Sequence, residues 1–82
     1  MKLSEFLEGL TILKPHYKGG DGFHLGAEHD VFYAYATDTP LTTSEVERMV
    51  ELGWFQEEAI VDDDGEFKAA NYIPEEGWQA YV

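Results

Sequence analysis

The sequence predicts an α+β fold: a single, mostly antiparallel sheet of four or five strands, with two helices packed on one face, in the order α-β-β-α-β-β-β. Three observations lead to this prediction. Two segments carry apolar residues at helical spacing, short segments rich in β-branched and aromatic residues lie between turn signals, and the connections are too short for parallel crossovers. With 82 residues and no cysteine, the chain is expected to form a single domain, 1–82, with one core and no disulfide.

The first helix is expected to begin at Ser4 and to end at about Lys14. Ser4 is a good N-terminal cap, and Pro15 cannot continue a helix because it lacks a backbone N–H. The apolar stripe of this helix consists of Leu3, Phe6, Leu7, Leu10 and Leu13. A glycine-rich loop at 19–22 follows.

Residues 23–37 predict two strands joined by a turn near 28–30. The first strand alternates apolar residues with small or polar ones. The second, 31–36, is β-branched and aromatic on both faces, which is typical of a central strand.

The second helix has the strongest terminal signals in the sequence. Thr42 and Glu45 fit a capping box, and Gly53 fits a left-handed C-terminal cap. After that cap, Trp54 is expected to fold back on Met49.

The C-terminal third of the chain predicts a hairpin and a last strand. The hairpin consists of strands 59–61 and 66–69 around the acidic turn 62–65, which ends in glycine. The last strand is expected at 78–82.

The charge of the chain limits its partners. Seventeen Asp and Glu against five Lys and Arg give a net charge of −12, and residues 28–82 carry all of it. Such a surface repels phosphate and anionic lipid, so we expect no direct binding to nucleic acid or to membranes. The sequence also lacks a long apolar run and the features of a signal peptide, so a cytoplasmic location is expected.

The residue types favour a binding module over an enzyme, and no cofactor is predicted. The two serines, Ser4 and Ser44, lie at helix starts, and no phosphate-binding loop is present. A divalent-cation module remains an alternative, using the acids at 62–64 or the pair His24 and His29. Neither set has the spacing of a known calcium or zinc motif, so no metal ligand is assigned.

Aromatic residues beside carboxylates predict a surface for a basic partner protein, because rings anchor a contact and acids steer a positive surface toward it. The expected contact residues are Glu45, Glu47, Glu51, Trp54, Glu57, Glu58, Asp62, Asp63, Asp64 and Glu66. A further alternative is self-association along an open sheet edge, as in a virion or assembly component. The residues that would support it are Tyr33, Tyr35, Trp78 and Tyr81.

Three stretches, 28–33, 45–55 and 77–81, resemble small acidic proteins of tailed bacteriophages and prophages, and the likeness covers roughly residues 28–82. In size and charge the chain is also similar to phage DNA-mimic inhibitors, which place carboxylates where DNA phosphates would lie on a basic enzyme groove. These resemblances imply an inhibitor that occupies a basic surface of a bacterial host protein, such as a nucleic-acid-handling enzyme. They imply no catalytic residue.

Overall fold

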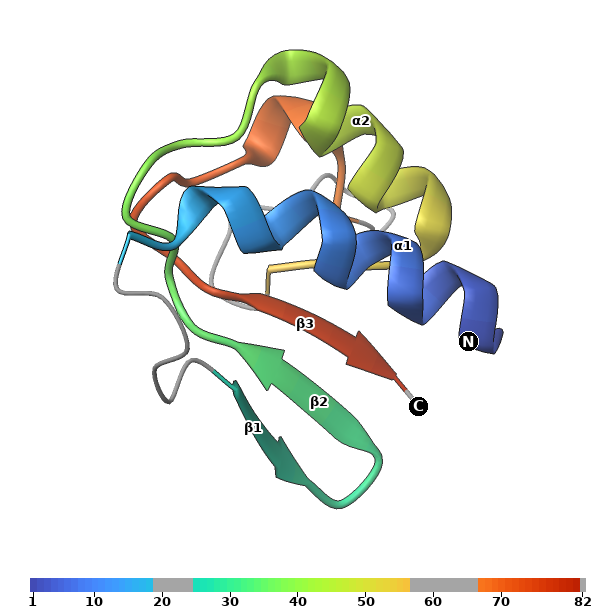
Figure 1. The fold of residues 1–82 in the computed structure, drawn as a ribbon. Helices are drawn as coiled ribbons and strands as arrows, with labels where there is room; N and C mark the ends of the chain where they lie inside the picture. The colour runs from blue at the N-terminus through green and yellow to red at the C-terminus, as the bar shows by residue number, and fades with distance from the viewer. Residues whose placement is uncertain (19–24, 57–66, 82) are drawn as a thin grey trace.

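The computed structural model describes residues 1–18, 25–56 and 67–81. These residues form an α+β fold in which two helices lie together on one side of a three-stranded antiparallel sheet (Figure 1). Two short 3₁₀ helices complete the described elements. Their order is α1 (Leu3–Leu13), η1 (Lys14–His16), β1 (Leu25–Glu28), β2 (Val31–Ala34), α2 (Thr43–Leu52), η2 (Ala69–Asn71) and β3 (Trp78–Tyr81).

The predicted number of strands was wrong for the described residues, because the second hairpin does not extend into 67–69. Phe67 and Lys68 lie in no strand, and Ala69 begins η2. Two contacts explain the difference. The Asn71 N–H donates to the Lys68 carbonyl at 2.8 Å, which closes a helical turn, and the Phe67 ring packs edge-on against Trp78 with centroids 5.5 Å apart. Residues 59–66 of the predicted hairpin lie outside the described residues.

The N-terminal cap of α1 also differs from the prediction. Ser4 lies inside the helix, and Lys2 is the capping residue. The Lys2 backbone N–H donates to the Glu5 carboxylate at 2.7 Å, so an acid in the first turn satisfies a donor that the predicted serine cap would have left unpaired. The helix ends at Leu13, and Pro15 lies in η1, which confirms that the proline ends it.

The sheet has the order β1-β2-β3, with β2 in the centre as predicted. Leu25 pairs with Ala34 at one end of the first hairpin and Glu28 with Val31 at the other, so the loop is His29 and Asp30. His29 has a φ of 55°, in the left-handed region that tight two-residue hairpin loops require. The turn predicted near 28–30 is therefore confirmed.

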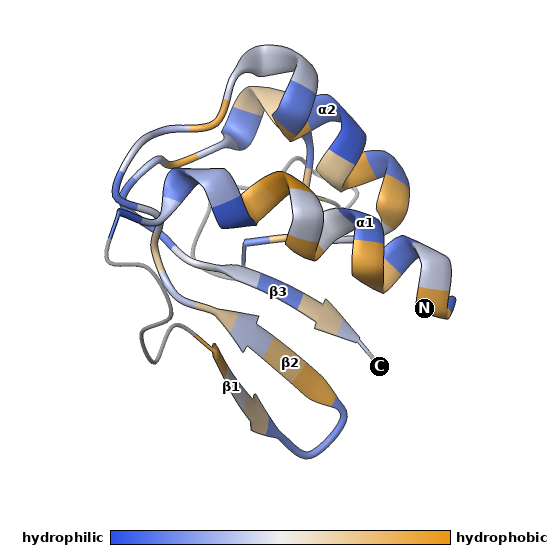
Figure 2. Ribbon diagram, in the orientation of Figure 1, coloured by the Kyte–Doolittle hydropathy of each residue, from blue (hydrophilic) through white to orange (hydrophobic). Residues whose placement is uncertain are grey.

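The helix α2 begins and ends as its capping signals predict. The Glu45 N–H donates to the Thr42 hydroxyl at 3.2 Å, and the Thr42 N–H donates to the Glu45 carboxylate at 2.9 Å. Gly53 has a φ of 97°, and the Trp54 N–H returns to the Met49 carbonyl at 3.0 Å. Figure 2 shows hydrophilic and hydrophobic residues alternating along α2, as expected for a helix with one buried side.

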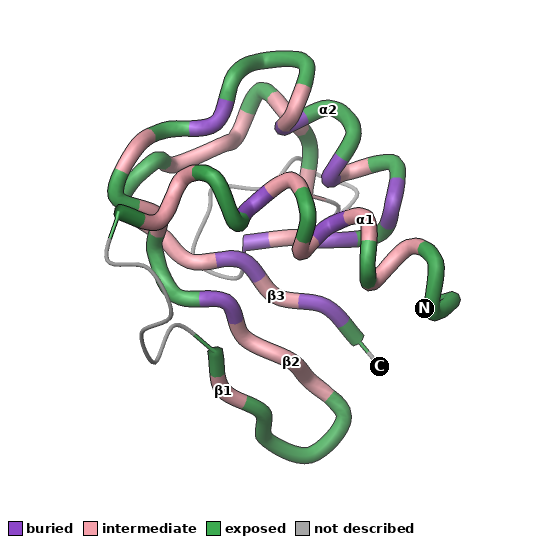
Figure 3. The backbone as a smooth tube through the Cα atoms, in the orientation of Figure 1, coloured by how far each residue is buried: buried purple, intermediate pink, exposed green. Residues whose placement is uncertain are grey.

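The core lies between the two helices and the face of the sheet turned toward them (Figure 3). The Trp54 ring stacks on Phe6 with centroids 5.8 Å apart and meets Phe32 edge-on at 6.4 Å. Gly9 makes this packing possible, because a Cβ at that position would lie 2.1 Å from the indole nitrogen of Trp54. The buried hydrophobic residues are Leu13, Ala34, Leu41, Val46, Met49, Leu52, Trp54, Trp78 and Ala80.

Candidate interaction surface

The structure places one predicted contact residue, Trp54, in the core. Its side chain is 1% exposed, so it cannot contact a partner, and the prediction for this residue was wrong. The reason is the left-handed cap at Gly53, which turns the chain back under α2 and directs the indole toward α1. Trp78, considered for self-association, is equally buried and stacks on Tyr72 with centroids 5.8 Å apart.

Glu45, the first of the predicted acids on α2, is occupied inside the molecule. Both of its carboxylate oxygens lie 3.0 Å from the Nε2 atom of His16, and one accepts from the Thr42 N–H. Burial on its own raises the pKa of Glu45, but the hydrogen bonds from Thr42 and His16 outweigh burial and lower it overall. This carboxylate therefore anchors η1 to the start of α2.

Glu51 and Glu47 are both exposed on α2, and among residues 1–18, 25–56 and 67–81 a cation, Arg48, pairs with Glu51 and none with Glu47. Arg48 donates from its Nη1 atom to Glu51 at 3.3 Å, and from Nε and Nη2 to Glu8 on α1. The hydrogen bond from Arg48 lowers the pKa of Glu8, and the same pairing raises the pKa of Arg48. Part of the negative charge on α2 is thus already balanced by Arg48.

Six other predicted contact residues lie outside the described residues, and their role stays a prediction. They are Glu57, Glu58, Asp62, Asp63, Asp64 and Glu66.

Sequence reasoning missed a partly buried polar cluster around His16. The Nδ1 atom of His16 lies 2.9 Å from the Thr39 hydroxyl, and Nε2 lies against Glu45. A hydroxyl, an imidazole and a carboxylate in a row can activate a nucleophile. However, His16 and Thr39 do not line either of two hollows that the described residues form, and Asp38 and Thr39 donate their N–H groups to the His16 carbonyl. The cluster joins η1 to the segment before α2 and to α2 itself. The one local sequence pattern that involves any of its residues is the capping box of Thr42 and Glu45.

The other face of the sheet carries aromatic residues, and no helix of the described chain lies over it (Figure 1). Register pairs Val31 with Tyr81 and Tyr33 with Gln79 on this outer face. Phe55 extends the face beside β3 through backbone hydrogen bonds of 2.9 and 2.7 Å with Gln79, and its ring stacks on Tyr81 at 5.0 Å. Tyr81 is 63% exposed, and Tyr35, which follows β2, is 56% exposed.

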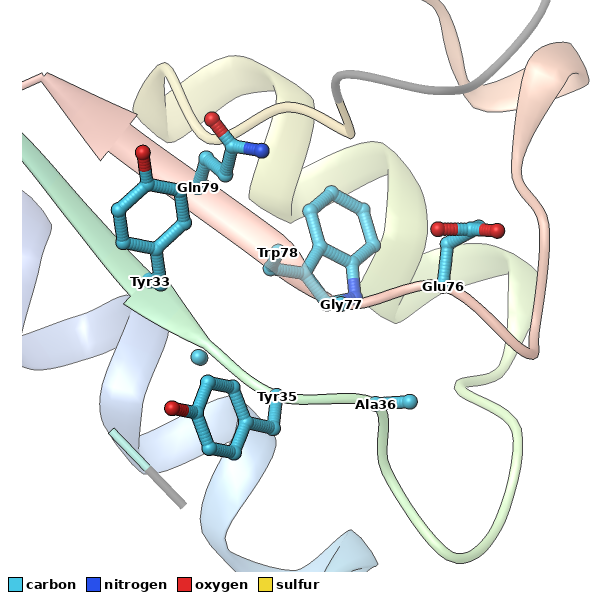
Figure 4. Close-up of a pocket in the computed structure, with 8 residues that line it drawn as sticks. Tyr33, Tyr35, Ala36, Glu76, Gly77, Trp78 and Gln79 are labelled. Carbon is cyan, nitrogen blue, oxygen red and sulfur yellow. The ribbon is translucent and has the colours of Figure 1, made fainter. Parts of the chain in front are cut away.

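A hollow of about 350 Å³ opens where β2 ends and β3 begins (Figure 4). In that view Tyr33 extends from β2 and Tyr35 from the segment after it, Gln79 lies beside Tyr33, and Glu76 lies at the opposite end, beyond Gly77. Its lining residues are Tyr33, Ala34, Tyr35, Ala36, Glu76, Gly77, Trp78 and Gln79.

A second hollow, of about 380 Å³, lies between α2 and η2, and its walls are mainly aliphatic. Glu47 is its one charged lining residue.

The described residues show no metal centre. No group of three or more His, Cys, Asp or Glu that could hold an ion is present in residues 1–18, 25–56 and 67–81. The Nε2 atom of His29 lies 3.9 Å from a carboxylate oxygen of Glu28, and both side chains are exposed. His24 and the acids at 62–64 lie outside those ranges. No helix within them has both the length and the apolar character needed to cross a membrane.

Comparison with protein-family models, with curated proteins and with solved structures found no match to this chain. The expected likeness to bacteriophage proteins therefore stays a prediction.

Proposed function

We propose that this protein is a non-enzymatic interaction module that binds a basic surface of another protein through the outer face of its sheet. The observation that carries this proposal is an aromatic face in a chain with a net charge of −12, with Tyr35 and Tyr81 exposed and Tyr33 and Phe55 partly exposed. An exposed aromatic surface on a small domain is a common feature of protein contacts, since large rigid rings bury much area at little entropic cost.

The charge distribution specifies the kind of partner. Strands β1, β2 and β3 contain no Lys or Arg, whereas Glu28 lies on β1 and Glu76 lies two residues before the start of β3. A partner rich in Lys and Arg is attracted over a long distance and then held by contacts with the rings. A second copy of this chain would bring another charge of −12 against the same face, so a basic partner is favoured over self-association.

The class of basic partner that fits best is a nucleic-acid-handling protein, because such proteins present the most strongly positive surfaces. In that case this chain would occupy the groove that normally receives DNA or RNA. Glu28 and Glu76, the described acids beside the outer face, would then lie near positions that phosphates occupy, whereas Glu47 and Glu51 lie on α2, on the other side of the sheet. The role of the acids at 57–66 stays a prediction.

The test is an affinity capture with matched variants. The immobilised protein, a Tyr35→Ser/Tyr81→Ser variant and a Leu3→Ser variant are exposed to lysate of a bacterial host, washed, and eluted with a salt step. Leu3 is a suitable control because its side chain is 73% exposed and lies on α1, on the helical side of the molecule. Supporting results are a basic protein retained by wild type and Leu3→Ser, lost by the tyrosine variant, and released by salt. Release of the retained protein by competing DNA would support the proposal that this chain occupies a nucleic-acid-binding groove.

Retention of the same proteins by all three forms would contradict a role for the outer face. A concentration-dependent dimer in light scattering, lost in the tyrosine variant, would show that the outer face serves self-association instead.

A further inference from the structure

We propose that the hollow between Tyr35 and Glu76 is a pocket for one arginine side chain of the partner. This inference rests on the proposed function and specifies the group that the outer face recognises. The volume of about 350 Å³ is at the small end of the range for ligand sites, which suits a single long side chain.

The aromatic wall of the hollow favours a planar cation. Tyr33 and Tyr35 occupy alternate positions along the same chain segment, so both rings lie on the outer side of the sheet (Figure 4). A guanidinium group stacks flat on such rings, whereas the ammonium group of lysine is compact and strongly hydrated.

The opposite end of the hollow supplies a carboxylate for the same group. Among the described residues that line it, Glu76 is the one charged residue, and none is a Lys or Arg that would neutralise this acid. In Figure 4 the Glu76 carboxylate points away from the two rings, so a rotation of this side chain is needed to bring it to a guanidinium stacked on Tyr35. The bound guanidinium would then make two complementary contacts that a neutral side chain cannot make.

The loop that carries Glu76 is held in place by a buried amide. Gln56 is 1% exposed, and its side chain donates to the carbonyls of Ile73 and Glu76 at 2.9 and 3.1 Å while accepting from the Ile73 N–H at 2.8 Å. These three bonds fix the backbone around residues 73–76. The carboxylate is therefore attached to an ordered loop, which lowers the entropic cost of binding.

Gly77 brings this loop close to β2. A Cβ at Gly77 would lie 2.5 Å from the Ala34 carbonyl oxygen, so only glycine allows the chain to pass here without a shift of the backbone. This close approach places the loop with Glu76 and the segment with Tyr35 on the two sides of one hollow.

The experiment is a titration followed by NMR, with three peptides of equal length that alternate glycine with arginine, lysine or citrulline. Citrulline keeps the shape of arginine and removes its charge. We expect the arginine peptide to bind about tenfold more tightly than the lysine peptide, the scale of one stacked and charge-assisted contact. The amide signals of Tyr35, Gly77 and Gln79 should shift most.

Two variants and one control locate the contact. Glu76→Gln and Tyr35→Leu should each remove most of the preference for arginine over lysine. Glu75→Gln is the matched control, because this neighbour is exposed, carries the same charge and does not line the hollow. It should weaken both peptides slightly and equally. Thermal unfolding checks that each variant is folded.

The outcomes separate this inference from the proposed function. If arginine and lysine peptides bind equally well and Glu76→Gln behaves like Glu75→Gln, the arginine pocket is wrong while binding of a basic partner stands. If neither charged peptide binds more tightly than the citrulline peptide, both proposals fail.

Discussion

The two faces of the sheet are built from alternate residues of the same strands, yet they differ completely in what covers them. Phe32 and Ala34 of β2 face the helices and the Trp54 cluster, whereas Tyr33, between them in sequence, faces away. Figure 3 shows buried and more exposed positions alternating along β3. The difference indicates that the inner face determines stability and that the outer face is available for binding, so mutations should separate the two properties.

The largest effect is expected for Trp54→Ala, which removes the residue that joins α1 to the sheet. Truncating a buried tryptophan costs about 3–5 kcal/mol, which is comparable with the whole free energy of unfolding of a small domain. Urea unfolding followed by circular dichroism measures the loss. The matched variant is Tyr35→Ala, an exposed aromatic on the outer face. Equal losses for the two variants would contradict the division between the faces.

A second comparison uses the same substitution on each side of the sheet. Gly9→Ala puts a methyl group 2.1 Å from the Trp54 ring, whereas Gly26→Ala on β1 meets the Tyr35 hydroxyl at an ordinary 3.5 Å. Overpacking costs about 1–3 kcal/mol, which outweighs the gain of up to about 1 kcal/mol from replacing glycine in a helix. Gly9→Ala should therefore lower the melting temperature, and Gly26→Ala should leave it nearly unchanged. A stabilised Gly9→Ala protein would show that α1 is not packed tightly on Trp54.

These contacts also show which parts of the fold local sequence could predict. The capping box at Thr42, the glycine cap at Gly53 and the turn after Glu28 all depend on residues within a few positions of one another, and all three were predicted correctly. The α+β class and the placement of both helices on one face followed from the same local patterns.

The errors concern contacts between distant residues. Trp54 was predicted as a contact residue, but the cap at Gly53 turns it inward and Gly9, 45 positions earlier in the chain, leaves room for its ring in the core. Likewise His16 meets Glu45 across 29 positions, and no local pattern indicates that pairing. The part of the predicted strand that the structure describes, 67–69, failed for the same kind of reason, since the ring contact of Phe67 with Trp78 is a tertiary one.

The third prediction concerns Glu45, which joins η1 to the start of α2 through its contacts with His16 and Thr42. Because its pKa is lowered in the folded state, its stabilising contribution is present above its ordinary pKa of 4.5 and is lost as the pH falls through the folded value. Glu45→Gln should cost about 1 kcal/mol at neutral pH after allowance for solvent screening, and should flatten the loss of stability in acid. The control is Glu47→Gln, an exposed neighbour on α2. Identical acid profiles for these two variants would exclude a special role for Glu45.

The fourth prediction tests the hydrogen bond between Tyr17, which follows η1, and Tyr35, which follows β2. Burial, together with the charge of Asp38, raises the pKa of Tyr17 to about 12. Its hydroxyl donates to the Tyr35 carbonyl, and only the neutral form can do so. The contribution of Tyr17 is therefore complete below pH 10 and is lost as the pH rises from there toward 12. Chemical unfolding across this alkaline range should show a decline that Tyr17→Phe reduces, and an unchanged decline would overturn the assignment.

The smallest effect on stability, and the sharpest test of the comparison, is expected for Tyr81→Leu on the outer face. Tyr81 is 63% exposed and its ring stacks on Phe55, so the change should alter the free energy of unfolding by about 0.5 kcal/mol or less. Its affinity for a basic partner should nevertheless fall through faster dissociation, because a ring contact acts after the encounter. The salt dependence of association should remain, because the carboxylates are untouched.

Glu76→Gln should show the converse pattern in stopped-flow kinetics, with slower association and a weaker salt dependence. If Tyr81→Leu changed association and salt dependence as Glu76→Gln does, rings and acids would not have the separate roles proposed for them.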